Sequence, residues 1–70
     1  MSWQQAVYSS MISDVGWDDA NEELLVTFRN GRTAAYKGPD EAKAQELANA
    51  ASVGTMFNAE IKNFYSFRYL

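Results

Sequence analysis

The sequence predicts an α+β fold in which two short helices cover one face of a small antiparallel sheet, itself a β-hairpin with flanking strands. Two observations predict this arrangement. Segments rich in strand-forming residues lie on both sides of Asn30-Gly31, as in a β-hairpin. After the hairpin, apolar residues recur at helical spacing in two successive segments. With 70 residues, the chain is expected to form one domain over residues 1–70.

The first predicted strand covers residues 8–17, where the alternation of apolar side chains is imperfect. Met11, Val15 and Trp17 share one face, whereas Ile12 falls on the other. Either a β-bulge or an early start of the strand would reconcile them. The polar run at residues 18–21 predicts a turn, because Asp and Asn side chains bond their own backbone.

The second and third strands are expected at residues 23–29 and 33–37, joined by a two-residue type I′ turn at Asn30-Gly31. A turn of that length fixes the register and pairs Leu25 with Tyr36. One face of the hairpin should then meet the core, and it carries Leu24, Val26, Phe28 and Ala35. The outer face combines an aromatic ring with positive charge, and it carries Arg29, Arg32, Ala34 and Tyr36. This outer face is the predicted place for a ligand; the alternative is an ordinary hairpin with solvated arginines.

The first helix is expected to begin at Gly38-Pro39-Asp40-Glu41, since proline suits the first turn and acids suit the positive end of the helix dipole. Its apolar stripe consists of Ala44, Leu47, Ala48 and Ala51. Ser52 is expected to cap a second helix over residues 53–63. The buried arc of that helix consists of Val53, Phe57, Ile61 and Phe64. The alternating tail, residues 65–70, predicts an edge strand.

Three polar side chains, Ser10, Ser52 and Asn58, are expected to have structural roles. Ser10 and Asn58 lie among apolar residues, and Asn58 is expected to lock its helix to the sheet through a backbone hydrogen bond. Ser52 is interpreted as a cap, because the chain has no histidine to activate a serine nucleophile. Cysteine is absent too, and the acids do not follow the spacing of an EF-hand loop. The sequence therefore predicts a binding protein rather than an enzyme, without a metal or a cofactor.

The formal net charge is −3, and five of the nine acids fall within residues 14–23. Such a balance argues against tight, non-specific binding of duplex nucleic acid. The absence of cysteine fits a reducing cytoplasm. No apolar run approaches the roughly 20 residues that span a bilayer, and the N-terminal residues do not resemble a signal peptide. We therefore expect a cytoplasmic protein with no membrane partner.

Several of these segments, in this order and spacing, resemble the KTSC domain family. The matching segments cover roughly residues 8–69, and they are Ser9-Ser10-Met11-Ile12, Val15-Gly16-Trp17-Asp18, Leu25-Val26-Thr27-Phe28, Asn30-Gly31, Tyr36, Ala51-Ser52 with Gly54, Phe57-Asn58, Ile61-Lys62 and Tyr65. The family is named for its occurrence at the C-terminus of some lysyl-tRNA synthetases, and it includes stand-alone bacterial and phage proteins. This sequence departs from the family's central Tyr-x-Tyr pattern, since Ala34 stands at its first position and Tyr36 at its second.

The synthetase context of the family implies RNA binding, and two hypotheses about function follow. The first is a non-enzymatic module that binds nucleic acid or a nucleotide through Arg29, Arg32, Tyr36 and Lys62. The second is a protein-interaction module, for example a phage-encoded inhibitor or a homodimeric adaptor. It would act through the acidic residues or through the terminal aromatic residues, which are Trp3, Phe67 and Tyr69.

Overall fold

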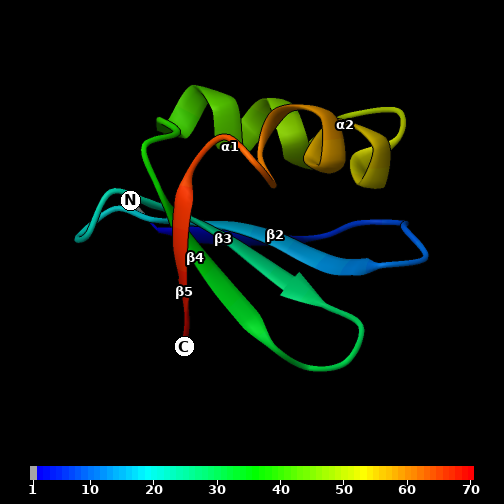
Figure 1. The fold of residues 1–70 in the computed structure, drawn as a ribbon, viewed down its shortest axis with the longest axis horizontal. Helices are drawn as coiled ribbons and strands as arrows, with labels where there is room; N and C mark the ends of the chain where they lie inside the picture. The colour runs from blue at the N-terminus through cyan, green and yellow to red at the C-terminus, as the bar shows by residue number, and fades with distance from the viewer. Residues whose placement is uncertain (1) are drawn as a thin grey trace.

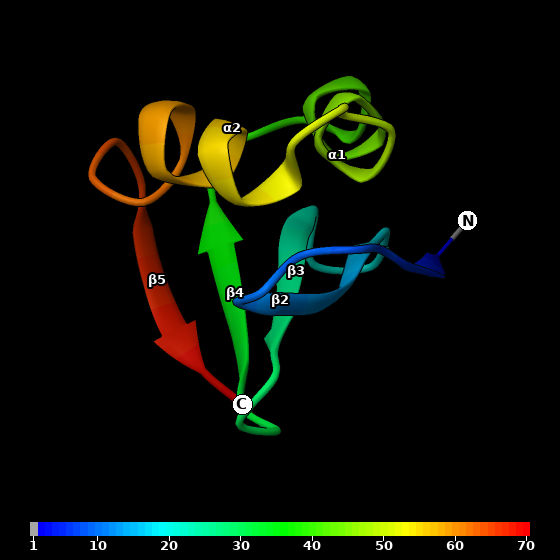
Figure 2. The same ribbon diagram turned by 90° about the vertical axis from the view of Figure 1, so that its right-hand side faces the viewer.

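The computed structural model describes residues 2–70 as two layers, an antiparallel sheet with a pair of helices over one face (Figure 1). Figure 2 shows both helices on the same side of the strands. The five strands lie in the sheet in chain order, β1-β2-β3-β4-β5. The elements are β1 (Trp3–Ala6), β2 (Ile12–Asp18), β3 (Glu23–Phe28), β4 (Thr33–Lys37), α1 (Glu41–Ala48), α2 (Val53–Glu60) and β5 (Ser66–Tyr69). The predicted α+β fold and the predicted edge strand near the C-terminus are therefore confirmed.

Strand β1 is the element that the sequence did not predict. Only Trp3 among its four residues is partly buried, so the strand carries almost no alternation of apolar and polar side chains. Antiparallel pairing with β2 and long-range side-chain bonds to α1 hold it in place instead. Trp3 Nε1 donates to Glu41 Oε2 at 2.9 Å, and Gln5 Nε2 donates to the carbonyl oxygen of Ala48 at 3.1 Å. Local sequence does not reveal contacts of this kind.

Strand β2 contains a bulge, which explains its imperfect alternation. The register shifts between Ile12 and Asp14, where Ser13 is the extra residue. Ile12 and Val15 consequently face the same side of the sheet, and both are fully buried. Of the two explanations, the bulge is confirmed. The strand begins at Ile12 rather than at residue 8.

The loop between β3 and β4 is one residue longer than predicted. The N–H of Gly31 donates to the carbonyl oxygen of Phe28 at 3.0 Å. The N–H of Phe28 donates to the carbonyl oxygen of Arg32 at 2.8 Å. Residues 29–31 therefore form a three-residue loop, in which Gly31 has a φ of 92°. The predicted type I′ turn is wrong. Such a turn needs a positive φ angle at both Asn30 and Gly31, and the φ angle of Asn30 is not positive.

This longer loop moves Tyr36 to the other face of the hairpin. Tyr36 pairs with Leu24, not with Leu25, and therefore points toward the helices. Only 3% of Tyr36 is exposed, and Ala34 on the same face is fully buried. Ala35 takes the outer face, in register with Leu25. The predicted outer placement of Ala34 and Tyr36 is wrong, since a one-residue shift in register exchanges the two faces of a strand.

The core lies between the sheet and the helices, with Phe57 of α2 at its centre. The Phe57 ring packs edge-to-face against Phe28 and Tyr36, with 5.7 Å between centroids in each pair. The largest fully buried side chains are Phe57, Ile12, Leu24, Leu47, Ile61, Val15 and Val26. Two residues predicted to be buried are not: Ala51 follows the end of α1 and is exposed, and Phe64 is 66% exposed. Phe64 lies beyond α2, so the helical periodicity no longer applies to it.

Helix α2 starts after the predicted cap, and α1 starts within the predicted segment but after Pro39, which precedes the helix instead of lying in its first turn. Asp40 is the N-cap of α1, and its carboxylate accepts from the N–H of Lys43 at 2.9 Å. Ser52 is the N-cap of α2, yet its hydroxyl bonds Thr55 Oγ1 at 2.8 Å rather than a backbone N–H. Helix α2 ends at Glu60, earlier than predicted. Neither helix within residues 2–70 has the length and apolar character needed to cross a bilayer.

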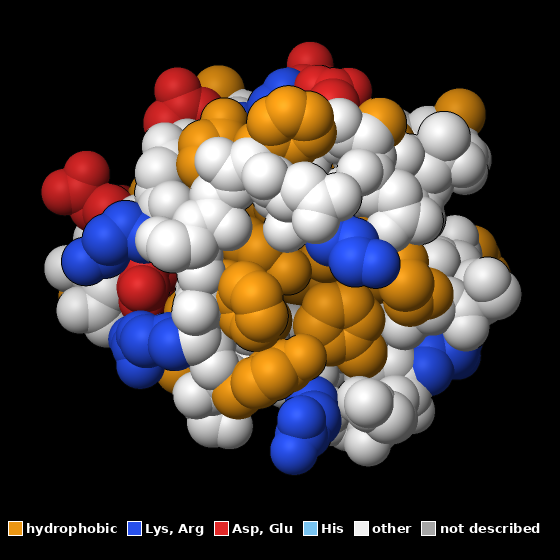
Figure 3. All heavy atoms as spheres, viewed as in Figure 1, with side chains coloured by type: hydrophobic (Ala, Val, Ile, Leu, Met, Phe, Trp, Pro, Cys, Tyr) orange, Lys and Arg blue, Asp and Glu red, His pale blue; other side chains and the backbone are white. Residues whose placement is uncertain are grey.

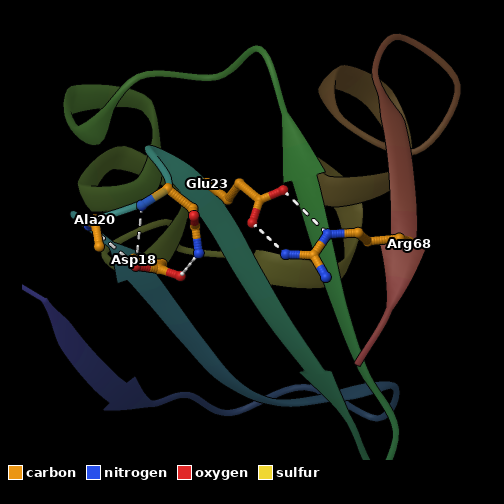
Figure 4. Close-up of polar contacts among 5 residues, drawn as sticks. Asp18, Ala20, Glu23 and Arg68 are labelled. Atoms are coloured by element: carbon orange, nitrogen blue, oxygen red, sulfur yellow. Dashed lines mark hydrogen bonds and ion pairs between the residues drawn. The ribbon is translucent and has the colours of Figure 1, made fainter.

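The turn between β2 and β3 is organised by Asp18, as predicted for this acidic segment (Figure 4). Asp18 Oδ1 accepts from the N–H of Ala20 at 3.1 Å and of Asn21 at 3.3 Å, and its Oδ2 accepts from Asn21 Nδ2 at 2.9 Å. The bonds from Asn21 lower the pKa of Asp18 below 3.8. The Asp18 carboxylate therefore has a structural role in this turn.

Candidate binding groove

A groove with a volume of about 540 Å³ opens beside the C-terminal end of α2 and across strands β4 and β5. We call it the aromatic groove, and its lining consists of Ser10, Met11, Phe28, Arg29, Asn30, Tyr36, Phe57, Lys62, Asn63, Phe67 and Tyr69. Figure 3 shows apolar side chains gathered in the middle of this side of the molecule, with basic side chains around them. The acidic side chains in that view lie toward the margin.

The rings of the groove come from adjacent strands on the face covered by the helices. Tyr36 of β4 pairs with Phe67 of β5, and Ala34 pairs with Tyr69. The Tyr36 and Phe67 rings stack with 5.2 Å between centroids, and Tyr69 packs edge-to-face on Phe67 at 5.3 Å. Helix α1 packs over β2 and β3. Phe67 and Tyr69 are therefore left about half exposed, at 48% and 53%.

Three basic side chains surround these rings. Arg29 and Lys62 line the groove, and the Arg32 guanidinium carbon lies 4.8 Å from the centroid of the Tyr69 ring. Within residues 2–70 none of the three forms an ion pair with an acid, whereas Lys43 and Arg68 do. Of the four predicted ligand-binding residues, Arg29, Tyr36 and Lys62 thus line the groove, and Arg32 lies against the Tyr69 ring beside it. Tyr36 reaches it from the core side, contrary to the prediction.

Arg29 is oriented by a backbone contact. Its Nε donates to the carbonyl oxygen of Ser9 at 2.6 Å. That bond leaves the two terminal nitrogens of the guanidinium group without a hydrogen bond among the described residues. A guanidinium with both terminal nitrogens available can donate to two oxygens of one phosphate or carboxylate.

Tyr36 contributes a ring to the core and a hydroxyl to the groove. The hydroxyl makes no hydrogen bond within residues 2–70. Every buried side-chain oxygen or nitrogen in these residues has a hydrogen-bond partner, so the Tyr36 hydroxyl oxygen is not buried and is open to solvent. Burial of the ring raises the pKa of Tyr36 above 10.0, and the neighbouring Tyr69 phenol adds to this shift. Tyr36 is therefore a neutral hydrogen-bonding group at physiological pH, and it does not repel an anion.

The three polar residues with predicted structural roles share a second hollow, and Ser10 lines the aromatic groove as well. Ser10, Ser52 and Asn58 are all exposed, and together they line a shallow hollow of about 350 Å³. The prediction that Ser10 and Asn58 are embedded among apolar groups is wrong, because both side chains face solvent. The serine that organises the backbone is Ser9, whose Oγ accepts from the N–H groups of Met11 and Ile12. This short-range pattern, typical of Ser before a turn, was available in the sequence.

The terminal aromatic residues of the protein-interaction hypothesis do not share one surface. Trp3 lies on β1 and Phe67 and Tyr69 lie on β5, at opposite edges of the sheet. The acidic segment is also divided, since Glu23 is buried on the outer face and paired with Arg68 (Figure 4). These two residues are 45 positions apart in the sequence, so no local pattern connects them.

Comparisons with known proteins agree on one family. The family sequence model of the KTSC domain matches residues 8–65 of this chain. The crystal structure of the KTSC domain protein YPO2434 from Yersinia pestis is similar to this chain, with a TM-score of 0.86 and 34% sequence identity, over 100% of this chain and 99% of that one. No curated protein sequence matches significantly. The chain therefore belongs to the KTSC domain family.

Proposed function

We propose that this protein is a non-enzymatic module that binds an unpaired nucleotide, free or within single-stranded RNA, in the aromatic groove. The base lies against the exposed ring of Phe67, and the phosphate is bound by Arg29, Arg32 and Lys62. The observation that carries the proposal is the clustering of charge. In a chain of net charge −3, three basic side chains without acidic partners in residues 2–70 surround one aromatic surface.

The chemistry of a nucleotide matches both halves of this groove. A base offers a π-face, and stacking on an exposed aromatic side chain contributes roughly 1–3 kcal/mol per base. A phosphate accepts hydrogen bonds from guanidinium and ammonium groups, which are strong because both partners are charged. The volume of about 540 Å³ is within the usual range for a small-molecule site. Cytoplasmic localisation is part of this proposal, since RNA and nucleotides are abundant in that compartment.

Unpaired nucleotides are favoured over a duplex for two reasons. The bases of a duplex are stacked on one another and present only their edges, so they cannot lie on Phe67. The acids of residues 14–23 also oppose an extended contact with phosphates. Three phosphate contacts on a single strand correspond to a salt dependence with a slope of about −2.

Fluorescence anisotropy with a labelled single-stranded RNA tests the proposal. We expect Arg29→Ala, Arg32→Ala and Lys62→Ala each to weaken binding by about fivefold to tenfold and to lower the magnitude of the salt slope by about 0.7. Lys37→Ala is the matched control, because Lys37 also lacks an acidic partner within residues 2–70 but neither lines the groove nor contacts one of its rings, as Arg32 does. The same RNA in a duplex should bind more weakly, and competition by mononucleotides shows whether the free form also binds.

Equal losses in Lys37→Ala and the three groove variants would contradict the proposal, because they would indicate an effect of net charge alone. So would an affinity that none of the variants changes.

A second function, protein interaction, is favoured by one observation. Phe64 and Leu70 are 66% and 65% exposed near the C-terminus, outside the groove lining, and β5 is one of the two edge strands of the described sheet. Exposed apolar residues beside a free strand edge suit pairing with a partner strand or with a second copy, as in a homodimeric adaptor or a phage-encoded inhibitor. Concentration-dependent dimerisation of a protein that fails to bind RNA would favour this alternative.

A further inference from the structure

Strand β5 supplies two rings of the aromatic groove, but it is weakly supported. All four of its residues are exposed, and its backbone pairs with β4 at one edge of the sheet. The side chains of Phe67 and Tyr69 point to the groove side. Arg68, between them, points to the opposite face, because successive side chains of a strand alternate. The groove therefore depends on what holds β5 against the rest of the sheet.

Arg68 connects β5 to β3 across the intervening strand (Figure 4). Its Nη2 donates to Glu23 Oε1 at 2.9 Å and its Nε to Glu23 Oε2 at 3.4 Å. Ala35 of β4 is in register with Arg68, and its small side chain leaves room for the guanidinium group. The Glu23 side chain is only 4% exposed, whereas that of Arg68 is 58% exposed. One end of the ion pair is therefore fixed in the sheet, and the other lies on the peripheral strand.

Because Glu23 is buried, loss of this ion pair is costly on the side of Glu23. A carboxylate that is removed from water and loses its partner is strongly destabilising, so displacement of β5 is opposed by the cost of an unpaired buried charge. The hydrogen bonds from Arg68 to Glu23 also raise the pKa of Arg68. Fixing Arg68 fixes its neighbours on the strand, and the stacking of Phe67 on Tyr36 at 5.2 Å depends on that position.

We propose that Glu23 and Arg68 are positioning residues that hold β5, and with it the Phe67 and Tyr69 rings, in the geometry that the groove needs for its ligand. Neither residue lines the groove. The identity of the ligand rests on the proposed function, whereas the effect of the pair on β5 does not.

Two variants with opposite changes in net charge separate positioning from electrostatics. Arg68→Gln lowers the net charge, and Glu23→Leu raises it while placing an apolar group in a buried site, which proteins usually tolerate. If the pair positions β5, both variants weaken binding of single-stranded RNA, by about tenfold, and both accelerate hydrogen exchange of the Leu70 amide, which donates to the carbonyl oxygen of Thr33 at 2.9 Å. If only charge matters, Glu23→Leu binds more tightly. Arg68→Lys keeps the positive charge, so it should weaken RNA binding and accelerate the exchange of the Leu70 amide less than Arg68→Gln does.

Lys43→Gln is the matched control. It also removes one positive charge from an ion pair, with Glu46 and Glu60, but at the helices. We expect it to change neither the exchange of the Leu70 amide nor, in the folded protein, the geometry of the rings.

Exchange at Leu70 and the contact between the Phe67 and Tyr36 rings are measured by NMR without ligand, so they test the pair even if the wild-type protein binds no RNA. In that case the proposed function fails, while loss of the ring contact in Glu23→Leu still supports positioning. Unchanged exchange and ring contact in both variants would overturn the inference, and so would altered exchange with unchanged RNA affinity.

Discussion

Replacing Phe57 with alanine is expected to remove most of the stability of the protein. The side chain is 2% exposed and contacts the Phe28 and Tyr36 rings at the centre of the core. Substitutions of buried Phe by Ala cost about 3–5 kcal/mol, because they remove apolar contacts and leave a cavity. A domain of 70 residues has about 4–10 kcal/mol in total. We therefore expect Phe57→Ala to be largely unfolded under mild denaturing conditions.

Urea unfolding followed by circular dichroism measures this effect. Asn58→Ala is the matched control, since Asn58 is the next residue on α2 and is exposed. Its free energy of unfolding should change by no more than about 0.5 kcal/mol. A loss below about 1 kcal/mol for Phe57→Ala would contradict the described core. A large loss for Asn58→Ala would contradict the exposed position of its side chain.

Gly38→Ala is expected to have the second largest effect on stability. Gly38 has a φ of 125°, which L side chains rarely adopt. A Cβ at this position would also lie 2.5 Å from Cδ1 of the Tyr65 ring, which packs against the core. The backbone conformation costs about 1–2 kcal/mol, and the overlap adds about 1–3 kcal/mol. Thermal unfolding should therefore show a marked fall in the melting temperature.

Two further variants separate these contributions. Gly31→Ala has the backbone strain without the overlap, because Gly31 has a φ of 92° and nothing lies within 4 Å of the place that a Cβ would take. It should be destabilised less than Gly38→Ala. In the background of Tyr65→Ala, the additional cost of Gly38→Ala should fall to that of Gly31→Ala. Equal losses for the two glycine variants in the wild-type background would show that Tyr65 does not pack on Gly38.

Local patterns in the sequence were sufficient for the helices and for most of the strands. The spacing of Val53, Phe57 and Ile61 identified the buried face of α2, and Ser52 marked its beginning. The beginning of α1 fell within the predicted residues 38–41. These features depend on neighbouring residues only. Strand β1 was missed because its position depends on bonds to α1, far along the chain.

The hairpin shows how one local ambiguity changes a predicted site. Asn30-Gly31 suits a two-residue turn, but it also suits a three-residue loop, since both place glycine at positive φ. The choice depends on the core, where Tyr36 gains contacts with Phe57 when it faces the helices. The sequence therefore predicted some of the residues of the candidate site, among them Tyr36, but not the side from which Tyr36 reaches it.

The rest of the groove could not be predicted because it is assembled from distant segments. Phe67 and Tyr69 complete it only because β5 pairs with β4. The position of β5 depends in turn on Glu23 and Arg68, which are 45 residues apart. The alternation in residues 65–70 predicted an edge strand, but nothing local indicates the neighbour of that strand or the face on which its rings lie.

The most direct test of the central claim is an NMR titration of the isotopically labelled wild-type protein with a short single-stranded RNA. If the aromatic groove binds an unpaired nucleotide, the amide signals of Arg29, Lys62, Phe67 and Tyr69 should shift in a saturable way. Signals from the opposite edge of the sheet, such as those of Trp3 and Gln5 on β1, should stay in place. Shifts confined to β1 and α1, or no shifts at saturating RNA, would contradict the claim.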